Sequence, residues 1–115
     1  MTFATREMFD LFQEACNLIP DEDSWCKHVL CKPVHLDITE SSQRCLIGAV
    51  WLARINTRAS REDYRKTIDY LSKGLPTDSN EDTVLSQLND NASSFHELER
   101  WMNEKLHRMK ADLTL

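Results

Sequence analysis

The chain has 115 residues, of which 41% are hydrophobic and 29% are charged. This balance is typical of a folded chain, and the length provides for one hydrophobic core but not for two. We therefore expect a single globular domain over residues 1–115. The formal net charge is −5, and lysines and arginines form no continuous stripe. Direct nucleic-acid binding is disfavoured, because it requires cations that neutralise phosphates.

No apolar run approaches the roughly 20 residues that a membrane-spanning helix needs. Arg6 and Glu7 stand where the apolar part of a secretory signal would lie. Both features predict a cytoplasmic protein with no membrane partner. In that compartment the four cysteines are expected to stay reduced, which makes a disulfide framework unfavourable.

An apolar stripe at three- and four-residue spacing predicts a first helix over residues 5–19, with Thr5 as its cap and Pro20 just beyond its end. Residues 34–38 alternate between apolar and polar types, as a half-buried strand does. The preceding stretch WCKHVL, residues 25–30, is bulky and partly β-branched. These two stretches predict a small β-hairpin.

The second helix is predicted to open at Ser41 or Ser42 and to run through CLIGAVWLARI, which is apolar on every side. Such a pattern is typical of a buried central helix. Gly48 in its middle costs about 1 kcal/mol against alanine, so another backbone or an aromatic ring is expected to pack closely there. Trp51 here, and Trp101 near the C-terminus, occur at core spacing and are predicted to pack in the interior.

The third helix is predicted to begin with Ser60 as its cap and to end at Gly74. A shorter helix is predicted to follow Asp78 or Asn80. It is expected to break at residues 89–91, Asn-Asp-Asn, because these side chains favour turns by bonding to their own backbone.

Ser94 and Glu97 form a capping box that predicts the start of a last helix. Its apolar face carries Leu98, Trp101, Met102, Leu106 and Met109. The elements together predict an α+β, mainly α fold. It comprises an N-terminal helix, a small β-hairpin and about four helices packed around the buried central helix.

Several short motifs occur in a recognisable order: Trp25, then Arg44-Cys45-Leu46-Ile47-Gly48-Ala49, then Leu88-Asn89-Asp90, then the helix from Phe95. In this order the chain resembles a family of small uncharacterised bacterial and phage proteins, catalogued as a domain of unknown function. The resemblance spans roughly residues 5–105. The chain departs from the family pattern with Leu88, where the family usually has Trp, and with a longer polar stretch before Arg44. The resemblance implies a fold and a bacterial or phage context, and it supplies no mechanism.

Cys45 is the first candidate for chemistry. With Ser42 as the cap, it would occupy the third helical position, where free N–H groups and the helix dipole lower a thiol pKa. A Cys-His-Asn hydrolase would also need one of the four histidines in reach, with Asn89 or Asn91 to orient it. Burial among apolar neighbours acts in the opposite direction and makes a thiol inert. We favour this structural role and assign no catalytic residue.

Cys26, His28, Cys31 and His35 are residue types that bind zinc in tetrahedral sites. Their spacing matches no familiar zinc finger or ribbon. The expectation is therefore no metal and no cofactor, with a zinc-stabilised binding module as an alternative.

Trp25, Arg44, Asn89 and Asp90 form the candidate binding site. An arginine at a helix start opposes the helix dipole, so Arg44 is expected to have a carboxylate partner, and Asp90 is the natural one. The four residues then either fix the fold or converge on a ligand. Trp25 follows a polar, acidic stretch, and partial exposure there would suit a protein contact.

These observations favour a small acidic, non-enzymatic interaction protein. The specific hypothesis is a phage-encoded inhibitor whose acidic surface docks on a bacterial host protein or defence complex. The rival hypothesis is a cysteine-dependent hydrolase or transferase that uses Cys45. The oligomeric state is left open by the sequence.

Overall fold

The structure is a computed structural model that describes residues 3–73, 75 and 81–114. Over these residues the chain forms five α-helices and one two-stranded antiparallel sheet, which confirms the α+β, mainly α class. The helices are α1 (Arg6–Leu18), α2 (Leu46–Thr57), α3 (Arg61–Ser72), α4 (Glu81–Asn91) and α5 (Phe95–Leu113). The strands are β1 (Cys31–Lys32) and β2 (Gln43–Arg44), and two short 3₁₀ helices are η1 (Glu22–Ser24) and η2 (Ile38–Glu40).

The first helix forms where the sequence predicts it. The Thr5 hydroxyl accepts a hydrogen bond from the Met8 backbone N–H at 3.2 Å, which satisfies one of the free donors of the first turn. The inward stripe of Met8, Leu11, Phe12 and Ala15 is buried. α1 therefore begins and ends within a residue of the predicted bounds.

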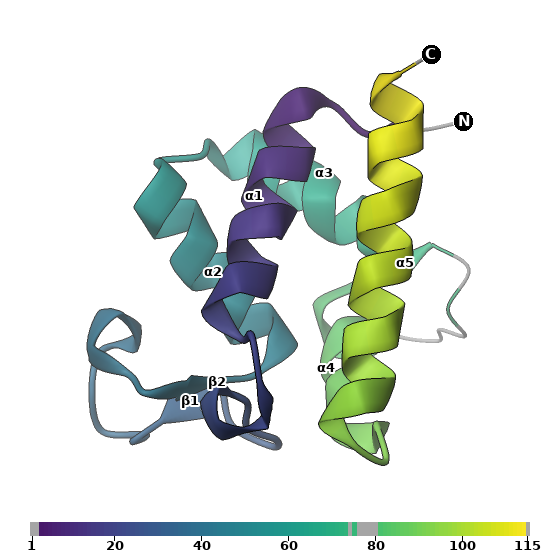
Figure 1. Cartoon of the computed structure of the whole chain (residues 1–115). Helices are drawn as coiled ribbons and strands as arrows, with labels where there is room; N and C mark the ends of the chain where they lie inside the picture. Colours follow the sequence, from purple (N-terminus) through teal and green to yellow (C-terminus); the bar gives the residue numbers. More distant parts are fainter. Residues whose placement is uncertain (1–2, 74, 76–80, 115) are drawn as a thin grey trace.

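α2 is the central helix of the molecule, as predicted. It contacts α1, α3 and α4, while the strands lie at its N-terminal end (Figure 1). Five of its side chains are buried, namely Leu46, Ala49, Val50, Leu52 and Ala53. Trp51 is an exception, since 37% of its surface is exposed. The prediction that it packs in the interior is therefore wrong. Its ring lies against Tyr64 and under Arg54, both on the outer surface of the helix pair.

The expected close contact at Gly48 is confirmed and involves backbone. The carbonyl group of Leu30 lies directly over Gly48, so that a Cβ atom added there would overlap the carbonyl oxygen. The same oxygen accepts a hydrogen bond from the Cys45 N–H at 3.1 Å. Glycine is required here because the segment before β1 packs directly on the helix backbone.

The hairpin exists, but the predicted strands 25–30 and 34–38 are wrong. The antiparallel pairs are Cys31 with Arg44 and Lys32 with Gln43. The stretch from 33 turns instead of extending, because the Leu36 N–H donates to the Pro33 carbonyl and η2 follows. Asp37 caps η2 by accepting from the Thr39 N–H and hydroxyl. The alternation in this stretch does not correspond to strand pairing.

The start of α2 also differs from the prediction. Cys45, rather than Ser41 or Ser42, is the N-cap residue, and its sulfur accepts from the Gly48 N–H at 3.3 Å. The helix begins later because β2 takes the residues just before Cys45, while Ser41 ends η2 through its hydroxyl bond to the Ile38 carbonyl. Cys45 is therefore not the third helical residue.

The later helices agree with the sequence where the structure describes them. Ser60 caps α3 and Ser94 caps α5. The Glu97 carboxylate bonds to the Ser93 N–H and hydroxyl, one residue before the cap, so the predicted capping box is only half formed. α4 continues through residues 89–90 and ends at Asn91, slightly later than predicted. The predicted signals at Gly74, Asp78 and Asn80 lie outside the described residues.

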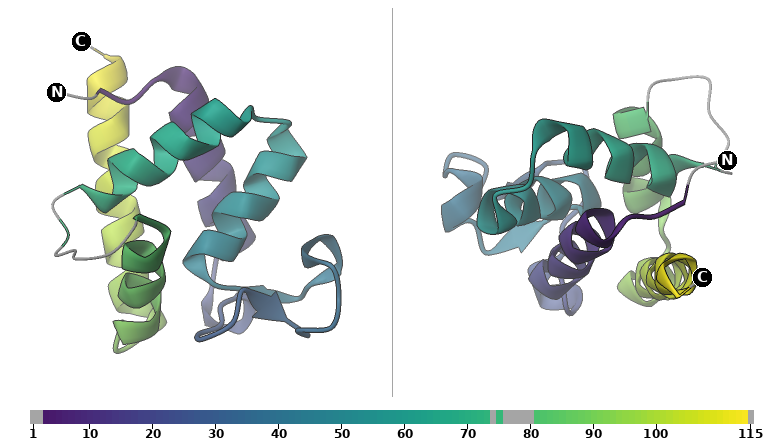
Figure 2. Two further views of the ribbon diagram at one scale, coloured as in Figure 1. Left: turned by 180° about the vertical axis from the view of Figure 1, so that it is seen from behind. Right: turned by 90° about the horizontal axis from the view of Figure 1, so that it is seen from above.

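The two ends of the described chain lie together. α5 runs along α1 (Figures 1 and 2). The Asp112 carboxylate near the end of α5 accepts hydrogen bonds from the Ala4 N–H at 3.0 Å and from the Tyr70 hydroxyl at 3.1 Å. Trp101 on α5 packs edge-to-face on Phe12 of α1, consistent with its predicted packing role. One hydrophobic core thus connects all five helices, with Leu85 as the contribution of α4.

Candidate functional site

Asn89 lies at the centre of the predicted binding residues and is fully buried. Its Oδ1 accepts from the Trp25 indole N–H at 2.7 Å and from the Leu46 N–H, the first of α2, at 2.9 Å. Its Nδ2 donates to the Cys26 carbonyl and to Asp90 Oδ1, each at 3.1 Å. The side chain therefore uses both of its donors and both acceptor sites within the protein. Asn89 joins α4, α2 and the chain around Trp25.

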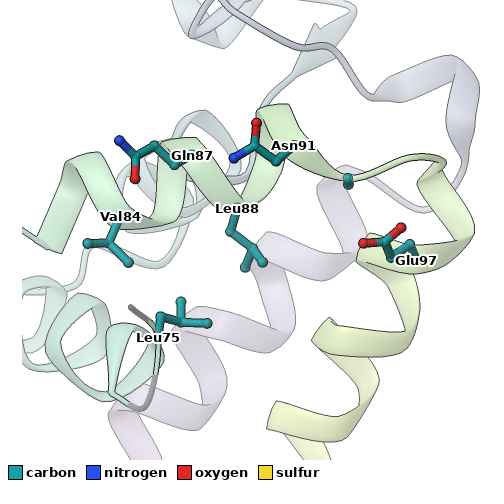
Figure 3. Close-up of a pocket in the computed structure, with 7 residues that line it drawn as sticks. Leu75, Val84, Gln87, Leu88, Asn91 and Glu97 are labelled. Carbon is teal, nitrogen blue, oxygen red and sulfur yellow. The ribbon is translucent and has the colours of Figure 1, made fainter. Parts of the chain in front are cut away.

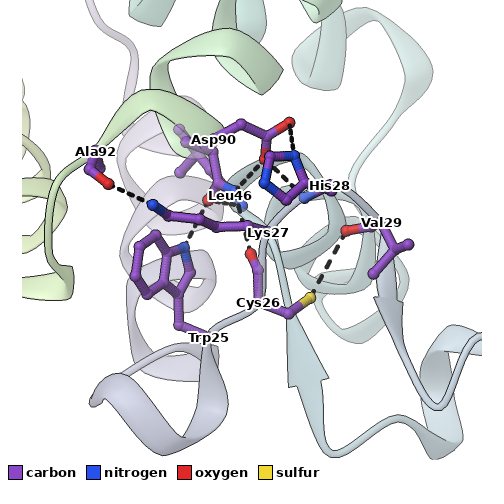
Figure 4. Close-up of polar contacts among 9 residues, drawn as sticks. Trp25, Cys26, Lys27, His28, Val29, Leu46, Asp90 and Ala92 are labelled. Atoms are coloured by element: carbon purple, nitrogen blue, oxygen red, sulfur yellow. Dashed lines mark hydrogen bonds and ion pairs between the residues drawn. The ribbon is translucent and has the colours of Figure 1, made fainter.

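Trp25 is half-buried and belongs to the same arrangement. Its ring packs on Phe95 at the start of α5, with the Lys27 ammonium 5.3 Å from the ring centre. Lys27 also donates to the Ala92 carbonyl, just after α4 (Figure 4). The structure thus brings Trp25 and Asn89 together and surrounds them with backbone contacts.

Arg44 does not pair with Asp90, which corrects the predicted ion pair. Its guanidinium donates to the Leu18 carbonyl at 3.0 Å and to the Ser41 carbonyl at 2.6 Å. The Leu18 carbonyl is at the C-terminal end of α1, where a cation complements the helix dipole. The orienting partner of the arginine is therefore a helix end, which local sequence does not indicate.

Asp90 instead holds His28. Its Oδ1 accepts from the His28 backbone N–H at 2.8 Å, and its Oδ2 lies 3.6 Å from His28 Nδ1 (Figure 4). His28 has a φ of 69°, in the left-handed region that is unfavourable for a side chain other than glycine. The carboxylate bond compensates for part of that strain.

A pocket of about 150 Å³ lies beside this pair. Its lining includes His28, Asp90, Ser86 and Cys45. The Cys45 residue is only 6% exposed, and burial raises its thiol pKa although the N–H groups of Gly48 and Ile47 lower it. Desolvation outweighs the helix N-terminus, so the thiol is held protonated as a helix cap rather than as an activated nucleophile.

The zinc-ligand residue types do not converge on one point. Cys26 and Cys31 are buried, whereas His28 and His35 are exposed. Over the described residues, no group of three or more His, Cys, Asp or Glu side chains is arranged to hold a metal ion.

A cluster of exposed apolar residues in the described part of the chain was not predicted from the sequence. Leu30, Val34, Leu36 and Trp51, named here the apolar face, line an open hollow of about 410 Å³ between the chain around β1 and α2. Val34 is 69% exposed, Leu30 47% and Trp51 37%. Alternating apolar residues are read as a half-buried strand, and only the turn after Pro33 directs Val34 to the solvent.

A second hollow of about 250 Å³ lies between α4 and the start of α5. Leu75, Val84 and Leu88 form its apolar side, and Gln87, Asn91 and Glu97 its polar side (Figure 3). Residues 76–80, which follow Leu75, are outside the described chain, so this lining comprises the described residues alone.

These features define a small helical domain with a short two-stranded sheet packed on the start of its central helix. A family model matches residues 4–108, and the chain belongs to that family, DUF6197, a family of unknown function. No protein of curated function and no solved structure matches the chain. Among the described residues, no helix is both long and apolar enough to cross a bilayer.

Proposed function

We propose that this protein is a non-enzymatic interaction module that binds another protein through the apolar face. The exposure of Leu30, Val34 and Trp51 around one hollow is the observation that carries the proposal. Burying an aliphatic or aromatic side chain of this size contributes about 1.5–3 kcal/mol. A partner that covers these exposed side chains would therefore gain binding free energy. Clustered exposed apolar side chains mark interaction sites, whereas single ones do not.

The charges beside the apolar face indicate the chemistry of the partner. Lys32 adjoins the lining residue Cys31, Arg54 lies over the Trp51 ring at 5.1 Å, and Arg58 is the C-cap residue just beyond the end of α2. None of the three forms an ion pair with a carboxylate in the described part of the chain. Asp37, next to the lining residue Leu36, accepts hydrogen bonds from Thr39 that lower its pKa, so it contributes one negative charge to this stretch. A chain of net charge −5 thus presents Lys32 and Arg54 next to residues of its apolar face, with Asp37 as one carboxylate in the same stretch.

The partner that fits is a protein segment with apolar side chains flanked by carboxylates. Such a partner reverses the charge assignment of the initial hypothesis, in which acidic residues of this chain meet a basic surface. That the chain is phage-encoded, acts in the cytoplasm and inhibits a host or defence complex stays a prediction. The rival hydrolase or transferase is less well supported, because Cys45 is buried and caps α2.

A displayed library of short random peptides tests the proposal. Peptides selected on the wild-type protein are expected to combine large apolar residues with Asp or Glu. Their binding should weaken at least about tenfold in Val34→Glu, because the new carboxylate lies in the apolar face and repels the acidic flank. Replacing the peptide carboxylates by lysine should abolish binding.

Phe3→Glu is the matched control, since Phe3 is 54% exposed but does not line the hollow. It should bind the selected peptides as the wild type does. Equal binding by the wild type and Val34→Glu would overturn the proposal. So would a library that yields no peptide bound more tightly by the wild type than by Val34→Glu. Binding to phospholipid vesicles in place of peptides would assign the face to a membrane surface and also overturn it.

A further inference from the structure

Cys26 and Cys45 occupy neighbouring positions on adjacent extended segments. Trp25 and Arg44 form a parallel bridge, and the Cys26 N–H donates to the Arg44 carbonyl at 3.1 Å. The residue after each bridge partner is a cysteine. Because equivalent residues of parallel segments point to the same face, the two side chains lie side by side.

Cys31 lies on the opposite face of the same sheet. It is the antiparallel partner of Arg44, so its side chain shares the Arg44 face rather than that of Cys45. Cys16 belongs to α1, away from the strands. Among the four free thiols, the backbone therefore selects one adjacent pair.

The spacing suits a covalent bond. Adjacent extended segments lie about 4.8 Å apart, and a disulfide joins Cα atoms roughly 4.4–6.8 Å apart. Cys45 also lines the 150 Å³ pocket beside His28 and Asp90, which gives a small oxidant a route to its sulfur. The two thiols are on adjacent residues, and Cys45, although only 6% exposed, is among the residues that line a pocket.

We propose that Cys26 and Cys45 are an oxidation site at which hydrogen peroxide produces an intramolecular disulfide. The reacting form is the thiolate of Cys45, which its raised pKa keeps a small fraction, so the reaction with peroxide is expected to be slow. The Cys45 sulfur bonds to one peroxide oxygen as the O–O bond breaks, and the products are a sulfenic acid and one water, which takes up the thiol proton. The Cys26 sulfur then attacks the Cys45 sulfur and displaces a second water. The two thiol hydrogens leave in the two waters, so the peroxide gains the two electrons that the thiols lose.

The disulfide would close the segment that carries β1, η2 and three residues of the apolar face. It would attach the start of this segment to the first turn of α2, on which it already packs at Gly48. Closing a chain segment restricts the unfolded state, so the oxidised protein should melt at a higher temperature than the reduced protein. This inference does not depend on the proposed function.

Peptide mapping of the peroxide-treated protein tests the pair. Trypsin cleaves after Lys27, Arg44 and Arg54, which places Cys26, Cys31 and Cys45 on three different peptides. The Cys16→Ser variant removes the second cysteine of the Cys26 peptide. In this background, peroxide is expected to lower the mass by about 2 Da, the mass of two hydrogens, and to join the Cys26 and Cys45 peptides.

Adding Cys31→Ser should leave the crosslink intact, whereas adding Cys26→Ala should abolish it. Cys45→Ser should also abolish it while keeping the fold, because serine is a good N-cap and replaces one hydrogen-bond acceptor with another. Circular dichroism verifies the fold of each variant. A dominant crosslink to Cys31, or no intramolecular crosslink in protein that remains folded, would overturn the inference.

Discussion

At the scale of single residues, the most consequential side chain is a buried amide. Asn89 bonds to the Trp25 indole, the Leu46 N–H, the Cys26 carbonyl and Asp90. A buried polar group is stabilising only when its hydrogen-bonding capacity is satisfied. Here the partners are Trp25 and Cys26 in one stretch, Leu46 at the start of α2, and the adjacent Asp90. The amide contributes the free energy of its hydrogen bonds, and it also determines which chain segments pack against each other.

Replacing this amide should therefore cost more than an average substitution. Asn89→Ala is expected to lower the free energy of unfolding by about 3 kcal/mol, because it leaves two buried donors and one acceptor without partners. Urea denaturation followed by circular dichroism measures the change. Asn91→Ala, at an exposed position of the same helix, should change stability by less than about 0.5 kcal/mol. Equal losses in the two variants would contradict the role assigned to Asn89.

At the scale of elements, the contact between α2 and the segment before β1 decides the shape of the site. Leu30 lies over Gly48 through its carbonyl group, and the following turn exposes Val34. The same contact places Cys45 at the cap of α2 and positions its N–H for the Leu30 carbonyl. One helix start thus positions the apolar face, the Cys45 pocket and the Asn89 bonds.

Gly48→Ala tests that contact directly. Helix propensity alone would stabilise α2 by about 1 kcal/mol. The added methyl group must displace a hydrogen-bonded backbone carbonyl, and such overpacking costs about 1–3 kcal/mol. We expect a net loss of stability in thermal or urea unfolding. Asn56→Ala, at an exposed position of α2, is the control; it removes one exposed hydrogen bond to Glu14 and should change stability by less than about 0.5 kcal/mol. A more stable Gly48→Ala variant would show that Leu30 does not pack as described.

At the scale of the whole molecule, Asp112 joins the N-terminal segment, α3 and α5 through Ala4 and Tyr70. Burial, together with the hydrogen bond to the Asp112 carboxylate, raises the pKa of Tyr70 to about 12 from its usual 10. The folded protein therefore holds the phenolic proton more tightly than the unfolded chain does. This stabilisation is complete below about pH 10 and is lost as the pH rises toward 12.

The pH dependence of the Tyr70→Phe variant measures this contribution. The stability advantage of the wild type should shrink by up to about 3 kcal/mol between about pH 9 and pH 12, as linkage requires for a shift of this size. Both proteins retain all four cysteines, so thiol ionisation cancels in the difference. Denaturant unfolding at several pH values gives the two curves. An advantage that does not vary with pH would contradict the assigned hydrogen bond.

The sequence by itself determined the features that depend on residues within a few positions of each other. Thr5, Ser60 and Ser94 cap their helices where predicted, since an N-cap side chain bonds to backbone N–H groups two or three residues away. The apolar stretch of α2 and its close contact at Gly48 also follow from local pattern. Of the predicted binding residues, Trp25 and Asn89 do lie together, and that they bind a ligand stays a prediction.

Only the tertiary structure decided which distant segments lie opposite one another. Strand pairing moved to residues 31–32 and 43–44, and the pairing delayed the start of α2 to Leu46. Arg44 donates to the C-terminal end of α1 instead of pairing with Asp90, and Trp51 is exposed at the surface. An alternating apolar pattern can occur in a strand or in a turning loop. A tryptophan at helical core spacing can be buried or exposed. Which of these structures forms depends on the distant segment that packs against the residue, and the local sequence carries no information about that segment.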